Sequence, residues 1–272
     1  MSEKLNLYFE EHKKLFFILN LLFIFILLTI FQRLAYPNAN FAEALTWNNI
    51  YYMLFGMEGE LGGLVLTFYI AIIAIVFSFL FGSLLGIARF STIKWLRIPA
   101  TIYIELFRAL PLIMVIFWVY FAIPIVAGAI FHTKVVASAL ASGIISFTLF
   151  ESAYIAEIVR AGLKSIPQGQ FEASKSLGMS SGQTFILVIL PQAYRRMIPA
   201  IVSQFVSLFK DTSLVYVIGV IEFFRASTIV NNRIYMSFEI LSFVAIVYFI
   251  CAFTLSKIAG KLEESVEKQL NS

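Results

Sequence analysis

Six long apolar runs limit what this chain can fold into more than any other feature. They lie at residues 15–31, 62–88, 104–131, 135–159, 196–220 and 237–257. A hydrocarbon core about 30 Å thick needs roughly 20 residues of helix to cross it. The runs therefore predict an all-α integral membrane protein with about six transmembrane helices and one membrane domain.

Composition supports this class, because 60% of the residues are hydrophobic, only 13% are charged, and the mean hydropathy is +0.89. The 17-residue run at 15–31 exceeds the usual apolar core of a signal peptide, and no A-x-A cleavage site follows, so we expect it to stay as a helix. The single cysteine, Cys251, excludes an intrachain disulfide and CxxC-type metal sites.

Basic residues flank the apolar runs instead of gathering on one soluble face, so the net charge of +4 indicates topology and not a nucleic-acid partner. Fourteen lysines and arginines fall on one side of the predicted membrane and four on the other. By the positive-inside rule, both termini are expected in the cytoplasm. The fourteen are Lys4, Lys13, Lys14, Arg89, Lys94, Arg97, Arg160, Lys164, Lys175, Arg195, Arg196, Lys257, Lys261 and Lys268, and the four are Arg33, Lys134, Arg225 and Arg233.

Two segments depart from plain spanning helices. Residues 36–60 are rich in aromatic side chains, which favours an interfacial helix on the outer leaflet over a disordered loop. The run at 104–131 contains Pro111 and Pro124, each of which removes a backbone donor. We expect this run to be broken or to face protein.

The segment of about 35 residues after the fourth run has signals of ordered structure. Ser165 with Gln168, and Ser180 with Gln183, match the capping-box spacing, and Gly178 between them is a stop signal. The pattern predicts two short helices with a tight corner on the cytoplasmic side. The first carries small polar residues beside few apolar ones, which favours docking to a protein over lying on lipid.

Residues 172–191, EASKSLGMSSGQTFILVILP, resemble the EAA loop of permease subunits of ABC importers. The loop's pattern is EAA, three residues, Gly, nine residues, Ile, one residue and Leu-Pro. Glu172, Ala173, Gly178 and the pair Leu190-Pro191 match it, while Ser174 and Val188 depart from it with residues of similar size.

Four further stretches resemble the polar amino acid uptake branch of the same family. They are IELFRALPL, SAYIAEIVRAGLKSIPQGQFEASKSLG, LPQAYRRMIPA and LFKDTSLVYVIGVIE. The likeness covers roughly residues 62–265, which implies the type I importer permease fold there. An extra helix and an outer segment at 1–61 would precede it, and a cytoplasmic tail at 266–272 would follow.

This resemblance implies a set of partners in a bacterial inner membrane. They are two cytoplasmic ATPases, a second permease, identical or related, that forms the dimer, an extracytoplasmic solute-binding protein and a polar amino acid as substrate, acidic or amide types slightly favoured. No G-x-x-x-x-G-K-[ST] phosphate loop occurs, so ATP and Mg²⁺ would be bound by the ATPases and this chain would be a non-catalytic permease. The residues implied in coupling are Gln170, Phe171, Glu172, Ala173, Ser174, Leu177 and Gly178.

Ionisable residues inside apolar runs are costly and are therefore candidates for the substrate path. Arg108 could pair with Glu105 one turn away and line an inner gate, or it could snorkel to the interface. Glu151, Tyr154 and Glu157 follow one another at i, i+3 and i+6. Glu157 is expected to pair with Arg160.

Other buried charges allow more than one role. Glu151 could line a cavity or satisfy another helix, with Lys210 as a possible partner. Lys210, Asp211, Thr212 and Ser213 interrupt the fifth run and could form a binding site or a structural hinge. Glu239 is expected to face water at the start of the sixth run.

The resemblance implies an ATP-driven importer that works by alternating access. A self-contained secondary transporter or channel is the alternative, and it would predict inverted repeats and leave the EAA-like segment unexplained.

Overall fold

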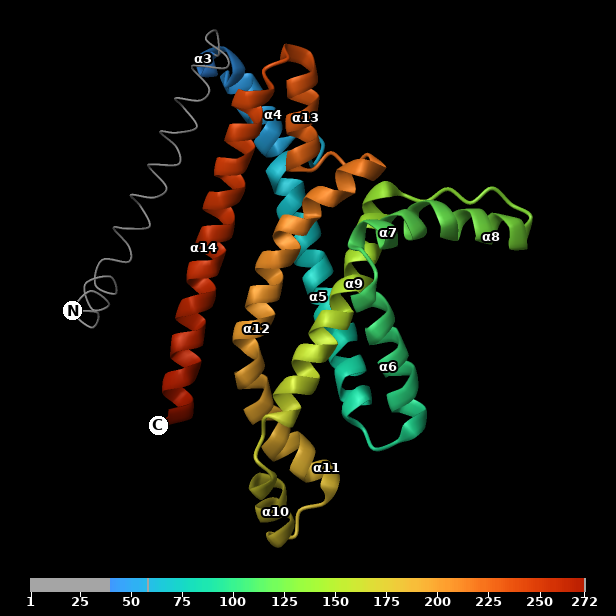
Figure 1. Cartoon of the computed structure of the whole chain (residues 1–272), viewed down its shortest axis with the longest axis vertical. Coiled ribbons are helices and arrows are strands. Elements are labelled where there is room, and N and C mark those ends of the chain that lie inside the picture. Colours follow the sequence, from blue (N-terminus) through green and yellow to red (C-terminus); the bar gives the residue numbers. More distant parts are fainter. Residues whose placement is uncertain (1–39, 58, 272) are drawn as a thin grey trace, which may run out of the picture.

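The computed structural model describes residues 40–57 and 59–271, with side chains described as far as Leu262, and its regular elements are all helices (Figure 1). In chain order they are α3 (Phe41–Ala44), α4 (Trp47–Phe55), α5 (Gly63–Phe90), α6 (Lys94–Ala109), α7 (Leu112–Phe117), η1 (Trp118–Ala122), α8 (Ile123–Phe131), α9 (Ala139–Lys164), α10 (Gln168–Ser176), α11 (Ser181–Gln183), η2 (Thr184–Ile189), α12 (Leu190–Asp211), η3 (Thr212–Ile218), α13 (Phe223–Ile234) and α14 (Ser237–Asn271).

Five helical stretches in the described part of the chain are long and apolar enough to cross a membrane. They are Gly63–Phe90, Leu112–Phe131, Ala139–Lys164, Ser181–Ile218 and Ser237–Leu262. The run at 15–31 lies outside the described residues, as do Lys4, Lys13, Lys14 and Arg33. A sixth helix at the N-terminus therefore stays a prediction.

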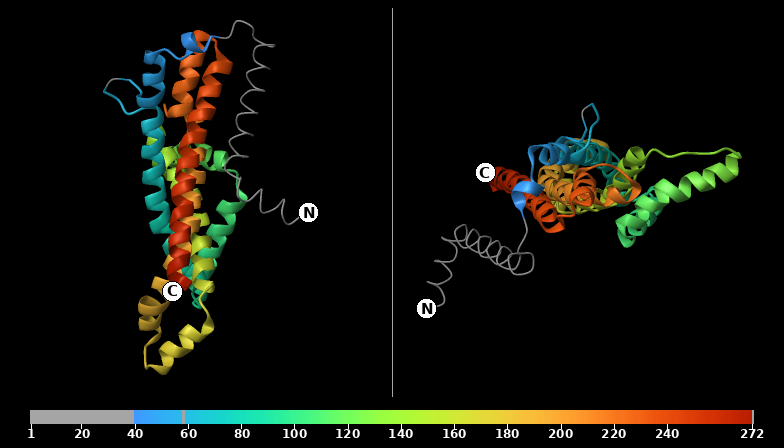
Figure 2. Two further views of the ribbon diagram at one scale, coloured as in Figure 1. Left: turned by 90° about the vertical axis from the view of Figure 1, so that its left-hand side faces the viewer. Right: turned by 90° about the horizontal axis from the view of Figure 1, so that it is seen from above.

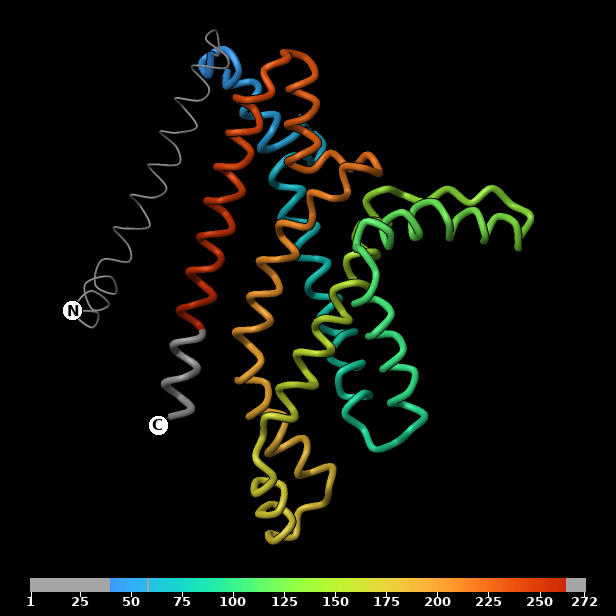
Figure 3. The backbone as a smooth tube through the Cα atoms, viewed as in Figure 1, coloured from blue at the N-terminus to red at the C-terminus, as the bar shows by residue number. Residues whose placement is uncertain are grey.

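The long helices α5, α9, α12 and α14 run lengthwise and form a bundle (Figures 1 and 2). Short helices α3, α4 and α13 gather at one end, which we call the α13 end. The segment 165–189, with α10, α11 and η2, projects at the opposite end, which we call the insert end (Figure 3). The short helices α3, α4 and α13 and the short helices of the insert therefore lie at opposite ends of the bundle.

A ridge of small residues brings α5 against α9. A Cβ added at Gly82 would lie 2.7 Å from the carbonyl oxygen of Ser152, and one at Gly86 would lie 2.6 Å from that of Ala156. The buried Ser78 hydroxyl, one turn earlier, donates to the carbonyl of Thr148 at 3.3 Å. Small residues at four-residue spacing allow close packing of membrane helices, so α5 and α9 form the central pair of the bundle.

The third apolar run, 104–131, is divided between two helical stretches, and its candidate membrane span is the shorter stretch Leu112–Phe131. Helix α6 ends at Ala109, and α7 begins after Pro111, which has extended backbone angles. From there α7, η1 and α8 turn across the bundle direction and extend away from it (Figures 1 and 2). The predicted break at this proline is confirmed, because Pro111 cannot donate to Phe107 and disfavours helix at Leu110.

Two further prolines change the helix type without ending the helix. The π-helical segment η1 lies just before α8, whose first turn holds Pro124, and η2 lies just before α12, whose first turn holds Pro191. A proline clashes with the carbonyl four residues earlier, and a π-turn relieves the clash by lengthening the hydrogen-bond spacing. The second helix of the predicted insert is therefore continuous with α12.

The α13 end has its own apolar core, in which Met53 of α4, Phe223 and Val230 of α13, and Ile240 of α14 are buried. The helical part of the prediction for 36–60 is thus confirmed by α3 and α4. Glu239 is only 4% exposed and accepts the Asn40 N–H at 3.1 Å, so the expectation that it faces water is wrong.

Candidate functional site

The corner after α10 forms as the glycine signal predicts. Gly178 has φ +78°, and its N–H donates to the carbonyl of Lys175 at 2.9 Å. The next residue, Met179, donates to the carbonyl of Ser174 at 3.2 Å. This pair of bonds is a Schellman motif, in which a glycine in the left-handed region ends the helix and satisfies its last carbonyls.

One of the two predicted capping boxes forms and the other does not. Ser180 and Gln183 exchange both bonds, with the Ser180 N–H donating to Gln183 Oε1 at 2.9 Å. Ser165 instead ends α9, and its hydroxyl donates to the carbonyl of Gly162 at 2.8 Å. The restricted backbone before Pro167 keeps Ser165 out of the capping position, so α10 begins after the proline.

Most of α10 faces away from its own chain. Glu172, Ala173 and Gln170 are exposed, and Leu177, which follows the helix, is 81% exposed. Ser174 is buried and donates to the carbonyl of Gln170 at 2.7 Å.

Phe171 packs against the core between α9 and α12. The seven residues predicted for coupling therefore divide into an exposed group, a supporting pair (Phe171 and Ser174) and the corner glycine.

Two polar contacts connect the insert to the helices on either side of it. Gln192 Nε2 of α12 donates to Gln170 Oε1 at 3.2 Å. Arg196 Nη1 of α12 donates to the carbonyl of Ser165 at 2.8 Å, and this cation lies at the C-terminus of α9, where the helix dipole favours positive charge. The insert is thereby attached to the ends of α9 and α12.

A cluster of charges joins α5, α6 and α9 at the insert end of the bundle. Glu157 Oε1 pairs with Arg160 Nη2, and its Oε2 lies 3.2 Å from Arg89 Nη1 and 3.9 Å from Arg108 Nη1. Arg89 also reaches Glu105 at 3.0 Å. The predicted pair of Glu157 with Arg160 is confirmed, and three arginines share this one carboxylate.

The local pair predicted between Glu105 and Arg108 is wrong within the described residues. Glu105 faces Arg89 across the α5–α6 hairpin, and Arg108 turns to α9, where its guanidinium lies 5.7 Å from the centre of the Tyr154 ring. Contacts to another helix compete with the i,i+3 geometry, whose gain is only a few tenths of a kcal/mol. The structure therefore brings together three of the polar residues singled out inside the apolar runs, namely Arg108, Tyr154 and Glu157.

Glu151 lies apart from that cluster, completely buried between α9 and α12. Its Oε2 accepts from Gln204 Nε2 at 2.6 Å, while its Oε1 has no hydrogen-bond partner among the described residues. The suggested pairing with Lys210 is absent from the ion pairs of the described chain. An unpaired buried acceptor costs about 1–3 kcal/mol, which marks this carboxylate as a functional candidate.

The block from Lys210 to Ser213 marks the change from α-helix to 3₁₀-helix. The Thr212 hydroxyl donates to the carbonyl of Phe209 at 2.7 Å, and that of Ser213 to Lys210 at 3.0 Å. Asp211 is the last residue of α12. The hydroxyls thus serve the backbone at a structural break, which agrees with the structural alternative for this block.

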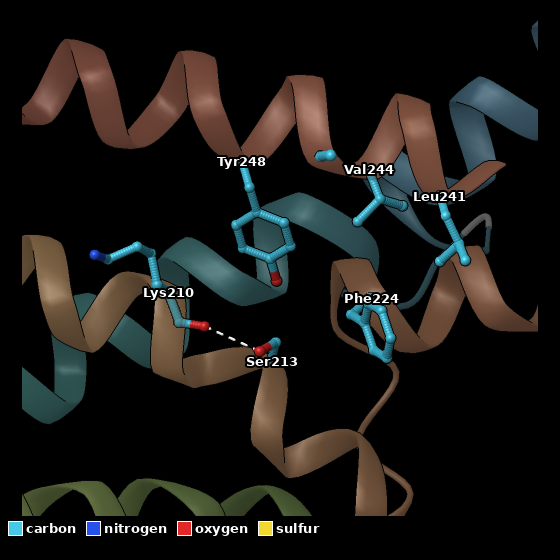
Figure 4. A pocket seen from close by; sticks show the side chains of 7 residues that line it. Lys210, Ser213, Phe224, Leu241, Val244 and Tyr248 are labelled. Atoms are coloured by element: carbon cyan, nitrogen blue, oxygen red, sulfur yellow. Dashed lines mark hydrogen bonds between the residues drawn. The ribbon is translucent and has the colours of Figure 1, made fainter. Parts of the chain in front are cut away.

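A cavity of about 420 Å³ beside this block is lined by Lys210, Ser213, Phe224, Leu241, Val244, Ala245 and Tyr248. Its polar groups do not converge, because the Lys210 ammonium points away from the other side chains (Figure 4). The Tyr248 hydroxyl donates to Glu222 at 3.2 Å, and that of Ser213 is used by the backbone. The cavity offers mainly apolar walls and no set of groups for a polar solute.

Three important residues were not singled out from the sequence. Arg89 was counted only as a flanking charge, and Gln204 carried no local signal. Glu222 caps α13 by accepting the N–H groups of Phe224 and Arg225, both at 2.8 Å. Glutamate is not among the preferred capping residues, so only its place before a polar helix could have indicated this role.

Comparisons with known proteins agree with this arrangement. Residues 78–266 match the family model of the "Binding-protein-dependent transport system inner membrane component". A probable glutamine ABC transporter permease of Bacillus subtilis (strain 168) is 40% identical over 204 residues, covering 74% of this chain and 90% of the relative. A glutamate/aspartate import permease of Escherichia coli O6:H1 is 37% identical, covering 75% and 91%.

Solved structures show the same fold. The crystal structure of an amino acid ABC transporter with histidines superimposes with a TM-score of 0.68 and 30% identity, covering 75% of this chain and 92% of that one. An inward-facing methionine ABC transporter gives a TM-score of 0.57 at 20% identity, covering 72% and 93%. The second likeness concerns the fold alone.

Proposed function

The chain belongs to the family of binding-protein-dependent transport system inner membrane components, and from that premise we propose that it imports polar amino acids of the amide or acidic type. It is a multi-pass permease subunit of an ABC importer, which excludes the self-contained transporter or channel considered above. Relatives at 40% and 37% identity are named for glutamine and for glutamate and aspartate, which supports this substrate class.

The exposed insert is the observation that carries the proposed mechanism. Helix α10 presents Glu172 and Ala173 to solvent, and the 81% exposed Leu177 follows at its tip. A large apolar side chain at the tip of a polar helix suits a pocket in a partner protein. The proposed partner is one of two cytoplasmic ATPases, which would bind the ATP because this chain has no phosphate loop of its own. In this arrangement the insert end and both termini face the cytoplasm.

The complete importer contains two permeases and receives its substrate from a solute-binding protein at the α13 end. Docking of the ATPases would displace α10, and the contacts of Gln170 with Gln192 and of Arg196 with Ser165 would pass the displacement to α9 and α12. The charge cluster around Glu157 would make the insert ends of α5 and α6 move with α9. The bundle would thereby alternate between its two open states.

Glu151 is the path residue with the best structural support. It lies on α9 and bonds to Gln204 of α12, and its Oε1 has no partner among the residues that the structure describes. Separation of α9 and α12 would expose a carboxylate that can receive the ammonium group of an amino acid. Lys210 and Asp211, in contrast, lie where α12 changes to the 3₁₀-helix η3, which supports the structural alternative for them.

Reconstitution tests this proposal. The permease is purified with its ATPase, placed in liposomes with the solute-binding protein, and assayed for ATP-dependent uptake of glutamine, glutamate and arginine. Co-purification of the ATPase is measured for Leu177→Asp and Glu172→Lys, with Glu60→Lys at the α13 end as the matched charge reversal. We expect both insert variants to lose the ATPase and uptake while Glu60→Lys keeps both.

Two results would overturn parts of the proposal. Normal co-purification of both insert variants would show that α10 is not the docking element. Preferred uptake of arginine over glutamine and glutamate would reject the amide or acidic substrate class while leaving the coupling intact.

A further inference from the structure

Helix α14 has one face that the described bundle does not cover. On its inner face Ile240 and Val244 are buried, and Tyr248 bonds to Glu222. On the opposite face Ile246 is 43% and Ile250 56% exposed. A helix in lipid is exposed in any case, so exposure alone does not identify what covers this face.

The described chain enters the molecule on this same face. The Asn40 N–H donates to Glu239 Oε1 at 3.1 Å, and the rings of Phe41 and Phe238 meet edge to face at 6.2 Å. Glu239 precedes Ile246 by seven residues and Ile250 by eleven, and these spacings place all three on one side of an α-helix. Whatever precedes Asn40 therefore starts at the α13 end of the uncovered face.

Residues 15–31 are the apolar segment that ends shortly before this point. Between residue 31 and Asn40 the chain can span at most about 30 Å. A helix of 17 residues is about 26 Å long, close to the thickness of the hydrocarbon core. A segment that crosses the membrane from this anchor must run antiparallel to α14 and begin within reach of its exposed face.

We propose that residues 15–31 pack as an antiparallel helix on the α14 face marked by Glu239, Ile246 and Ile250 of the same chain. The short connection raises the effective concentration of the segment at this face well above that of a second copy. Packing and not hydrophobicity drives helix association in lipid, and Ile246 and Ile250 lie one turn apart with exposed side chains that a neighbouring helix can contact. The extra N-terminal segment would thus serve as a cover for the last helix of the permease.

Disulfide cross-linking in native membranes tests this pairing. In a Cys251→Ser background, Ile250→Cys serves as reporter, and single cysteines are scanned from residue 19 to residue 31. A specific protease site inserted at 57–61 separates the N-terminal fragment, so an intrachain cross-link keeps the two fragments together after cleavage. The matched control reporter is Ile125→Cys, a position that is 70% exposed on α8, and α8 extends away from the bundle that contains α14 (Figures 1 and 2).

We expect cross-links to Ile250→Cys that recur every three to four positions, and none to Ile125→Cys. A second reporter, Ile246→Cys, should shift the reactive positions by about one turn toward residue 31. Cross-links that double the mass of the chain before cleavage would place the segment on a second copy and overturn the proposal. The absence of cross-links to both α14 reporters, in a chain that still binds its ATPase, would also overturn it.

Discussion

Replacing Glu151 separates a role in transport from a role in packing. Its Oε2 accepts from Gln204 at 2.6 Å, and its Oε1 has no partner in the described structure. Glu151→Gln keeps an acceptor for Gln204 and the same shape, so its effect on stability should stay below about 1 kcal/mol. Glu151→Leu leaves the Gln204 amide without this partner and should cost about 1–3 kcal/mol.

The uptake rate, unlike the stability, should already fall in Glu151→Gln. If the carboxylate receives the substrate ammonium, Glu151→Gln loses a charge-assisted contact of about 1.5–3 kcal/mol, and the uptake rate falls roughly 10- to 150-fold. Thermal unfolding in detergent gives the stability, and uptake into proteoliposomes gives the transport rate. Wild-type uptake by Glu151→Gln, with loss of uptake only in the unstable Glu151→Leu, would refute the transport role.

Other substitutions test the packing and the charge cluster. Gly86→Ala should lower the unfolding temperature, because a Cβ there meets the carbonyl of Ala156 at 2.6 Å and overpacking costs about 1–3 kcal/mol. Gly260→Ala in α14 should not lower it, since an added Cβ there meets no atom of another described element within 4 Å. Glu157→Gln should weaken uptake more than ATPase binding, since three arginines lose their shared counter-charge. A loss of ATPase in the pull-down as large as the loss of uptake would contradict this. Gly178→Val should reduce ATPase co-purification, because φ is +78° there and a β-branched residue strains the corner; an unchanged pull-down would show that the corner tolerates the strain.

Features that depend on neighbouring residues could be predicted from the sequence. The corner at Gly178, the capping box at Ser180 and the break at Pro111 each follow from a backbone requirement that one residue imposes on the next few. The membrane class followed from the length of the apolar runs. These rules need no knowledge of how the helices pack.

Pairings between helices could not be predicted in the same way. Arg108 lies within one turn of Glu105, yet its partners are Glu157 and Tyr154 on α9. Glu151 is bonded to a glutamine that is 53 residues away in the chain. Which residues meet across helices depends on the small-residue contact of α5 with α9 and on the turn at Pro111, and a single sequence does not specify the resulting rotation of each helix.

The way the insert is attached has a mechanical consequence. Covalently it continues only into α9 on one side and into η2 and α12 on the other, so a load applied to α10 divides between those two helices. The same two helices enclose Glu151 and Gln204 farther along the bundle. The π-turn before Pro191 lies on one arm of this lever, and the Arg196 bond to Ser165 joins the two arms near their base. If the ATPases move α10 as proposed, the two helices that carry Glu151 and Gln204 are the ones that would receive the movement.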